Sequence, residues 1–196
     1  MRLKSIELPK PSFQGSISLE QALADRVSVR SFIKQTLSLE QVGQLLWAGQ
    51  GYRDALGLRT APSAGALYPL ELYLITNEGV YNYIPKDHRM EPRVEGDKRP
   101  SLSNAALGQE CISQAPATFL LAAVFSRIET KYGQERSPQY IYLEAGHAAQ
   151  NILLQATALG LAGVPVGAFD EGQVSEFLQL PREHYPVYLI SIGYAK

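Results

Sequence analysis

Three side chains near the start of the chain have types and spacing that suit a phosphate group. Arg26, Ser28 and Arg30 alternate two guanidinium groups with a hydroxyl. Several charge-assisted hydrogen bonds from guanidinium forks and hydroxyls can converge on one phosphate dianion. The same residues could instead be solvated charges and a cap at the end of a helix. The segment therefore predicts a phosphate-bearing ligand only in combination with a second feature.

That second feature is a turn of small residues further along the chain. The turn is made of Pro62, Ser63, Ala64 and Gly65. With so little side-chain bulk, the backbone amides of such a turn can approach a flat ligand closely. An ordinary surface turn has the same composition, so either segment alone is ambiguous. Together they favour a cofactor that has both a phosphate and a flat ring system.

Composition and charge limit the class of protein. The 196 residues are 45% hydrophobic, which fits a single domain spanning residues 1–196. A net charge of -1 gives no general attraction for nucleic acid or anionic lipid. No apolar run approaches the roughly twenty residues that a membrane-spanning helix requires. The single cysteine, Cys111, cannot form an internal disulfide, and the N-terminal residues lack a signal-peptide pattern, so we expect a cytoplasmic protein.

Capping patterns and hydrophobic periodicity predict the helices. Ser18 and Ser38 each precede a glutamine by three residues at the start of a periodic apolar segment, which is a capping-box pattern. The second of these helices should end at Gly49 or Gly51. A longer helix, buried nearly all round, is expected over residues 139–161, and a short one over residues 173–178.

Runs of β-forming residues predict five strands. They cover residues 70–76, 79–84, 117–125, 164–169 and 187–192. The run 117–125 is apolar throughout and should lie in the middle of the sheet. Residues 85–100, rich in proline and charge, are interpreted as a hairpin and loop. The resulting order is α, α, β, β, β, α, β, α, β, an α+β arrangement of one sheet with helices packed against it.

Four motifs, taken in order, resemble the nitroreductase-like flavoproteins and more narrowly their SagB-type branch. They are Arg26-x-Ser28-x-Arg30, the segments Pro62 to Pro69 and Glu144 to Asn151, and the segment Gly163 to Phe169. This branch includes the dehydrogenases that aromatise thiazoline and oxazoline rings in ribosomally made peptides. The resemblance extends from about residue 17 to residue 196. It implies a central, mostly antiparallel sheet flanked by helices in a homodimer.

The resemblance also implies FMN, held at the dimer interface by residues of both subunits. In this sequence the matching cofactor-binding residues are Arg26, Ser28, Arg30, Pro62, Ser63, Ala64, Gly65, Pro165, Val166, Gly167 and Ala168. The last four match a segment whose backbone amides face the reactive N5 edge of the flavin. Ala66 stands where many nitroreductases have an asparagine that reaches the ring. Of the basic pair that most members carry near the C-terminus, this sequence supplies Lys196 alone.

Lys131 and Tyr132 are the candidate catalytic residues. Arg127, Lys131, Tyr132 and Gly133 resemble a segment of the azoline-oxidising branch in which the Lys-Tyr pair is implicated in catalysis. Aromatising an azoline requires removal of a proton from carbon while hydride leaves to the flavin, and a lysine whose pKa is lowered by burial can accept that proton. The pair could equally be a solvated charge and a partly packed ring on an exposed loop.

These expectations describe an FMN-dependent oxidoreductase that transfers hydride through flavin N5. Its substrates would be nitro or quinone compounds reduced at the expense of NAD(P)H, or a small-molecule or peptide heterocycle that is dehydrogenated. A flavin-binding or flavin-degrading relative without such turnover is the alternative. No metal site is expected, because the three histidines, His88, His147 and His184, are not in ligand spacing with a cysteine.

Overall fold

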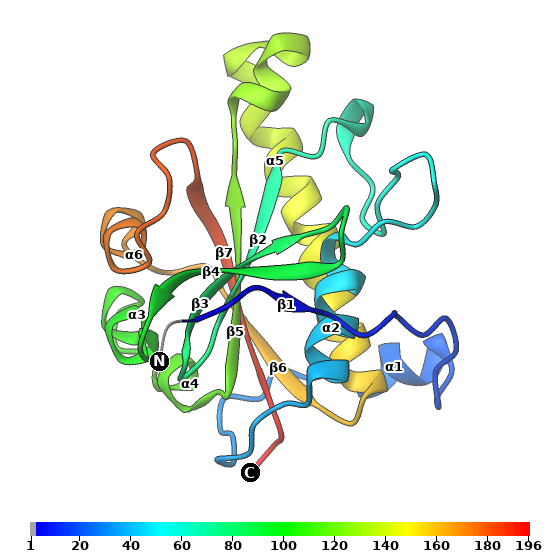
Figure 1. Cartoon of the computed structure of the whole chain (residues 1–196), viewed down its shortest axis with the longest axis vertical. Helices are drawn as coiled ribbons and strands as arrows, with labels where there is room; N and C mark the ends of the chain where they lie inside the picture. The colour runs from blue at the N-terminus through cyan, green and yellow to red at the C-terminus, as the bar shows by residue number, and fades with distance from the viewer. Residues whose placement is uncertain (1–2) are drawn as a thin grey trace.

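A computed structural model describes residues 3–196 and places seven strands in one sheet, with helices on both faces (Figure 1). The strand order is β1-β4-β3-β2-β5-β7-β6, and each neighbouring pair is antiparallel. The strands are β1 Ile6–Glu7, β2 Leu70–Ile75, β3 Gly79–Ile84, β4 Arg89–Glu95, β5 Ala117–Ala123, β6 Ala162–Val166 and β7 Tyr185–Gly193. The predicted α+β class with a mostly antiparallel sheet is confirmed.

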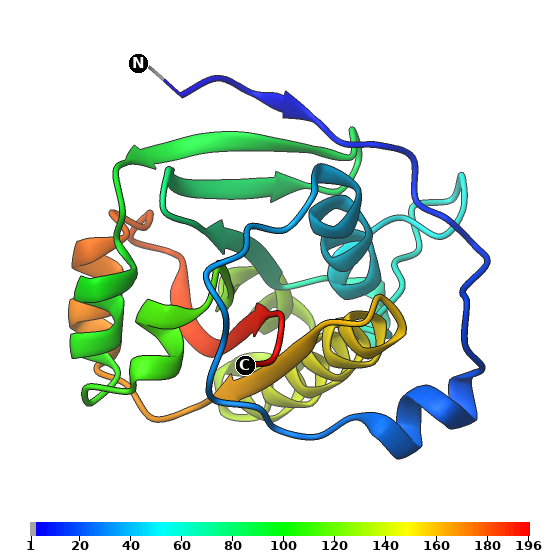
Figure 2. The ribbon, with the colours of Figure 1, turned by 90° about the horizontal axis from the view of Figure 1, so that it is seen from below.

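The helices form two layers, one on each face of the sheet (Figure 2). On one face α2 (Leu39–Gln50) packs against α5 (Ser126–Ala158), with α1 (Leu19–Asp25) beside α5. On the other face lie α3 (Arg99–Ala105), α4 (Glu110–Gln114) and α6 (Glu171–Phe177). Each face of the sheet therefore has its own hydrophobic cluster.

The predicted helix starts are confirmed by their caps. The side chain of Ser18 accepts a hydrogen bond from the backbone of Gln21 at 3.1 Å. Ser38 and Gln41 form a complete capping box at the start of α2, which ends at Gly51. Because these caps satisfy backbone groups that a helix leaves unpaired, they fix where each helix begins.

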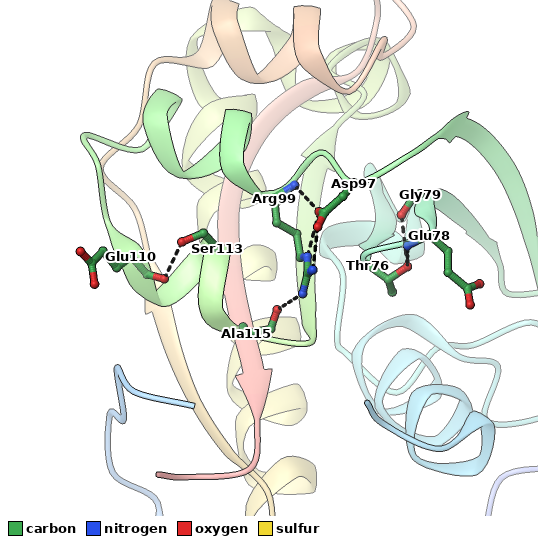
Figure 3. Close-up of polar contacts among 8 residues, drawn as sticks. All are labelled: Thr76, Glu78, Gly79, Asp97, Arg99, Glu110, Ser113 and Ala115. Carbon is green, nitrogen blue, oxygen red and sulfur yellow. Dashed lines mark hydrogen bonds and ion pairs between the residues drawn. The ribbon is translucent and has the colours of Figure 1, made fainter. Parts of the chain in front are cut away.

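Strand β5 lies in the interior of the sheet, next to the central strand β2, as its apolar run predicts. All seven of its residues are buried, and it pairs with β2 on one side and β7 on the other. The hairpin predicted at residues 77–79 joins β2 to β3, where the backbone of Thr76 donates to the carbonyl of Gly79 at 2.9 Å. In Figure 3, the hydroxyl of Thr76 also accepts from the backbone of Glu78.

Residues 85–100 differ from the predicted hairpin and loop. They contain a further full strand, β4, which follows β3 through a turn at residues 85–88 and carries Pro92 opposite Tyr81. The register of the pair shifts beside Tyr81. Proline is tolerated in a strand at such an irregularity because the missing donor disturbs little of the ladder.

Two short helices, α3 and α4, also follow where none was predicted. Arg99, in the first turn of α3, pairs with Asp97 at 2.7 Å and donates to the carbonyl of Ala115 at 2.8 Å (Figure 3). One side chain therefore ties the start of α3 to the segment that leads from α4 into β5.

The long helix α5 is more extensive than predicted and is not buried all round. It begins at Ser126, and Gly133, with φ 74° and ψ 164°, interrupts its helical geometry. The predicted span 139–161 covers only the part after this break. Ile141, Glu144 and Ala145 are buried against the sheet and α2, whereas Tyr142 and Leu143 are exposed. The helix thus buries one face and leaves another, which carries the apolar side chains of Tyr142 and Leu143, uncovered in the single chain.

Candidate active site

The Arg26–Arg30 segment lies along the edge of β6. Ser28 forms a parallel bridge with Gly163, and the backbone of Val29 donates to the carbonyl of Gly163 at 3.1 Å. Arg26 caps the end of α1, and its backbone donates to Ala22. Within residues 3–196, neither Arg26 nor Arg30 forms an ion pair with an acid. The two guanidinium groups remain available for an anion.

The Pro165–Ala168 segment extends from the same strand. Pro165 and Val166 are paired with β7, opposite Ile190 and Leu189. Gly167 and Ala168 follow the last paired residue and are exposed, so their backbone amides lie outside the ladder. The structure thus brings two of the predicted cofactor-binding segments, residues 26–30 and 165–168, to one edge of the sheet.

The turn of small residues lies against the predicted catalytic pair. Gly65, in the short 3-10 helix Ala64–Ala66, has φ 62°. A Cβ atom at this position would lie 2.7 Å from Nζ of Lys131 and 3.0 Å from Oη of Tyr132. A larger residue here would require the ends of both side chains to shift, and its positive φ would itself be strained. No direct signal of this contact exists in the sequence, because the two motifs are far apart in the chain.

Lys131 and Tyr132 lie in the first helical part of α5, before the break at Gly133, and not in a loop. Tyr132 is half-buried and packs against Tyr140, with the ring centroids 4.6 Å apart. Nζ of Lys131 lies 5.6 Å from the centre of the Tyr132 ring. Lys131 is exposed in the single chain, so the burial expected for its amine is not provided by this chain alone.

Arg127 fixes the start of α5 to the turn. Its guanidinium donates to the carbonyl of Tyr68 at 3.2 Å and pairs with the carboxylate of Glu71 in β2. Tyr68 has a positive φ of 48°, an unusual conformation for a residue with a side chain. The first turn of α5 and the segment 62–68 are therefore held as one unit.

The two groups of predicted residues lie along different parts of α5. The Pro62–Gly65 turn adjoins the first part of the helix, whereas α1 lies beside its end, where the Ser16 hydroxyl donates to the carbonyl of Ala158 (Figure 1). Within one chain the Pro62–Gly65 turn and the segment before α1 therefore contact different parts of α5.

Comparison with known proteins agrees with this arrangement. The model of the nitroreductase family matches residues 23–194. The chain belongs to the nitroreductase family. This nitroreductase-family chain is 38% identical over 195 residues to a protein of Methanocaldococcus jannaschii named as a candidate nitroreductase, and the match covers 96% of each. A candidate nitroreductase of Ralstonia eutropha superposes with a TM-score of 0.90 at 29% identity, covering 99% of this chain and 90% of that one.

Two longer relatives carry more specific names. The FMN reductase [NAD(P)H] of Bacillus subtilis is 26% identical over 188 residues, 89% of this chain and 64% of that protein. The microcin-processing protein McbC of Escherichia coli is 26% identical over 160 residues, 75% of this chain and 58% of that protein. The family-model match thus confirms the family that the four motifs predicted.

The donor set at the β6 edge fits a flavin mononucleotide. Arg26, Arg30 and the hydroxyl of Ser28 supply donors for a phosphate, and the exposed backbone at Gly167 and Ala168 supplies amides for a ring system. The backbone amide of Lys196 donates to the carbonyl of Ser31 at 3.1 Å, which brings the last residue beside the phosphate segment. The chemistry of these residues suits a cofactor that has both a phosphate and a flat ring system.

A buried acid that sequence reasoning left without a role lies behind the turn. Glu144 in α5 is 2% exposed, and neither of its carboxylate oxygens accepts a hydrogen bond from residues 3–196. Burial raises the pKa of Glu144 to about 7, although the side chains of Ser63 and Gln50 and the charge of Arg59 oppose the shift. The sequence signal that could have identified Glu144 is its position, because it lies where the spacing of the helix's apolar residues predicts a buried side chain.

The histidines have structural roles or face solvent. The Tyr83 hydroxyl lies 2.8 Å from Nδ1 of His88, and that of Tyr73 lies 2.5 Å from Nδ1 of His184. His147 is exposed on α5. Over residues 3–196 no group of three or more metal-ligating side chains is close enough to hold an ion, and none of the helices there is long and apolar enough to cross a bilayer.

Proposed function

We propose that the chain is an FMN-dependent oxidoreductase that works as a homodimer. The observation that carries this proposal is the bridge between Ser28 and Gly163. It places two unpaired guanidinium groups and a hydroxyl beside the strand that leads to the exposed Gly167–Ala168 backbone. A ligand with a phosphate at one end and an electron-accepting ring at the other matches that arrangement.

The residues of the β6 edge would each have a distinct role. Arg26, Ser28 and Arg30 would hold the phosphate through charge-assisted hydrogen bonds. The amides of Gly167 and Ala168 would donate to negative charge that develops on the ring, and fixed dipoles of this kind are effective because they need no reorganisation. FMN, when bound, supplies the capacity to accept and donate hydride.

A second copy of the chain would complete the site. The turn that matches the family's flavin-facing segment lies along the first part of α5, and α1, which the phosphate segment follows, packs against the same helix nearer its other end. Tyr142 and Leu143, on the α5 face that the chain leaves uncovered, are 58% and 52% exposed. Two copies packed across this face could bring the turn of one copy to the phosphate segment of the other.

The contact of Lys131 and Tyr132 with Gly65 favours substrate dehydrogenation of the SagB type. Lys131 is placed to accept a proton from a substrate carbon, and Tyr132 to orient the ring or assist that transfer. The similarity to McbC supports a small-molecule or peptide heterocycle as substrate. The similarity to an FMN reductase supports the second candidate, reduction of nitro or quinone compounds with NAD(P)H.

The proposal is tested by the visible absorption spectrum of the purified protein after incubation with FMN. We expect a yellow protein whose Arg30→Ala variant loses the flavin, while Arg53→Ala, a change of an exposed arginine in the loop after α2, retains it. A protein that stays colourless would refute the proposal. Lys131→Ala should keep the flavin but lose turnover; release of flavin by this variant would contradict its catalytic assignment.

Oxidation of NAD(P)H in the presence of nitrofurazone or menadione then separates the candidate reactions. Turnover with these acceptors would identify the reductive activity. Bound flavin that turns over neither these acceptors nor a thiazoline or oxazoline peptide would instead indicate a flavin-binding relative that lacks the proposed catalysis.

A further inference from the structure

The Gly167–Ala168 segment lies between two fixed points of the fold. Val166, the residue before the segment, is paired with Leu189 in the ladder between β6 and β7. Asp170, two residues after the segment, caps the start of α6, and its backbone donates to the carbonyl of Ala105 at 2.8 Å. The residues between these points need a further contact if their backbone is to keep one orientation.

Packing does not supply that contact at Gly167. A Cβ atom there would lie 3.8 Å from its nearest neighbour, Cε2 of Tyr188, so the surroundings of this residue are open. Gly167 and Ala168 are both exposed, and neither of their backbone amides donates a hydrogen bond within residues 3–196. Glycine also has more backbone freedom than any other residue. The orientation of these two amides therefore depends on what holds the carbonyl beside them.

The side chain of Gln109 holds the carbonyl of Ala168. Its Nε2 donates to that carbonyl at 3.1 Å and to the carbonyl of Ala106 at 3.0 Å. Because both neighbours are acceptors, the side-chain amide must present its nitrogen to them and not its oxygen. One amide group thus joins the turn between α3 and α4 to the segment that leads from β6 to α6, on the face of the sheet that these three helices cover (Figure 2).

Gln109 is itself held by its backbone on both sides. Its amide donates to the carbonyl of Ala106 at 3.2 Å, and its carbonyl accepts a hydrogen bond from the buried hydroxyl of Ser103 at 2.9 Å. Leu107 and Gly108, which precede it, have φ values of 59° and 74°. A left-handed conformation is unusual for a leucine and indicates a tightly determined turn. The hydrogen bond to Ala168 is therefore made from a fixed support.

We propose that Gln109 is a positioning residue, which holds the Ala168 carbonyl and thereby fixes the Gly167 and Ala168 amides in the orientation that meets the ring of the cofactor. This inference rests on the proposed function, in which those amides donate to negative charge on the ring. Dipoles stabilise such charge best when they are already oriented, because no reorganisation is then required. The hydrogen bond of Gln109 consequently favours the reduced cofactor, whose ring carries the added charge, over the oxidised one.

The first test needs no flavin and measures the order parameters of the Gly167 and Ala168 amides in the apoprotein by NMR relaxation. We expect values of about 0.85 in the wild type and below about 0.6 in Gln109→Met, whose side chain has the same length and cannot donate. Gln114→Met is the matched control, because Gln114 is an exposed glutamine of α4 whose side-chain amide donates to Glu110. This control should leave both order parameters unchanged. Low values in the wild type, or unchanged values in Gln109→Met, would overturn the proposal.

Gln109→Glu provides a second variant if the methionine variant does not fold. Its side chain keeps the same length, but at neutral pH the carboxylate presents only acceptors to the carbonyls of Ala106 and Ala168. The order parameters of the segment should fall as in Gln109→Met. Values equal to those of the wild type would contradict the role assigned to the glutamine.

The consequence for the cofactor has a separate readout, the midpoint potential of bound FMN. In Gln109→Met the binding of reduced FMN should weaken about tenfold more than that of oxidised FMN, which corresponds to a potential about 30 mV more negative. Loss of a purely structural contact would weaken both forms equally and leave the potential where Gln114→Met has it, which would contradict the proposal. A protein that takes up no FMN would refute the proposed function, whereas the order parameters would still decide whether Gln109 fixes the segment.

Discussion

At Gly65 the lack of a side chain serves two purposes. The backbone has a positive φ of 62°, and the space that a Cβ would fill is already taken by the ends of Lys131 and Tyr132. Either condition alone favours glycine, since a left-handed backbone is strained for other residues and close approach excludes a side chain. Together they make this residue the contact point between two segments that are distant in sequence.

Gly65→Ala should therefore be destabilising and should shift the ends of Lys131 and Tyr132. We expect a loss of about 1–2 kcal/mol in the free energy of unfolding, measured by urea denaturation, from the strain of an alanine at this positive φ. Gly15→Ala is the matched control, because a Cβ there would lie at an ordinary contact distance, 3.6 Å, from the carbonyl oxygen of Ile17. That control should stay within about 0.5 kcal/mol of the wild type. Equal stability of the two variants would mean that the backbone at Gly65 does not have the left-handed conformation.

Glu144 makes the stability of the fold depend on pH. Burial raises its pKa from 4.5 to about 7, so the folded state binds more protons than the unfolded state within this window. The free energy of unfolding should accordingly fall as the pH rises from about 4.5 to 7, by roughly 3 kcal/mol from this group. Glu144→Gln should remove that slope in urea denaturation at pH 5, 6 and 7. A slope unchanged in the variant would assign the effect to other groups.

The sequence predicted the separate motifs of the candidate site better than their contacts. Arg26, Ser28 and Arg30 are recognisable because guanidinium and hydroxyl groups at alternate positions have a specific chemical use. Glu144 is not, since its importance depends on the burial and unpaired oxygens that only the packed helix reveals. The exposure of Lys131 likewise depends on the surroundings of α5 and not on its neighbours in sequence.

At the scale of elements, hydrophobic periodicity predicted the helices and strands with a regular pattern and missed those whose sequence departs from it. The apolar run of β5 and the caps of α1 and α2 were sufficient to place those elements. Strand β4 was missed because Pro92 and its charged neighbours weaken the strand signal, while pairing with β3 and β1 supplies the hydrogen bonds. The first part of α5 was missed because it is short, polar and followed by a glycine.

That glycine determines how the two parts of α5 are joined. Gly133 has φ 74° and ψ 164°, a region that is almost restricted to glycine. The hydroxyl of Ser137 donates to its carbonyl at 2.6 Å, which satisfies one backbone acceptor at the break. The orientation of Lys131 and Tyr132 relative to the rest of the helix depends on this conformation.

Gly133→Ala should therefore cost about 1–3 kcal/mol in the free energy of unfolding, although no neighbouring atom lies within 4 Å of the new Cβ. The cost would come from the backbone alone. Gly146→Ala, in a regular part of the same helix with equally open surroundings, should instead stabilise the monomeric chain by up to about 1 kcal/mol. Chemical denaturation at protein concentrations that keep the chain monomeric provides the comparison. A neutral effect at Gly133 would show that the helix can run through this position without a break.

At the scale of the whole molecule, the residues predicted to bind the cofactor form two separate groups. The segments at residues 26–30 and 165–168 meet at the β6 edge, whereas the Pro62–Gly65 turn lies with Lys131 and Tyr132 along the first part of α5. These contacts place the two groups at different parts of the single chain. In the proposed dimer, two chains that share the uncovered face of α5 would each supply one of the two groups to each site.

Leu143→Asp tests this arrangement. The side chain is 52% exposed on the α5 face that the single chain leaves uncovered, so the substitution should hardly affect the folding of one chain. In a dimer it would bury an unpaired charge at the interface, which is costly. We expect sedimentation velocity to show dimers for the wild type and monomers for the variant, with FMN affinity at least tenfold weaker in the monomer. Leu107→Asp, at a 76% exposed leucine between α3 and α4, should remain dimeric and bind FMN normally. A monomeric Leu143→Asp variant that retained full FMN affinity would show that one chain binds the cofactor by itself, and the shared site would have to be abandoned.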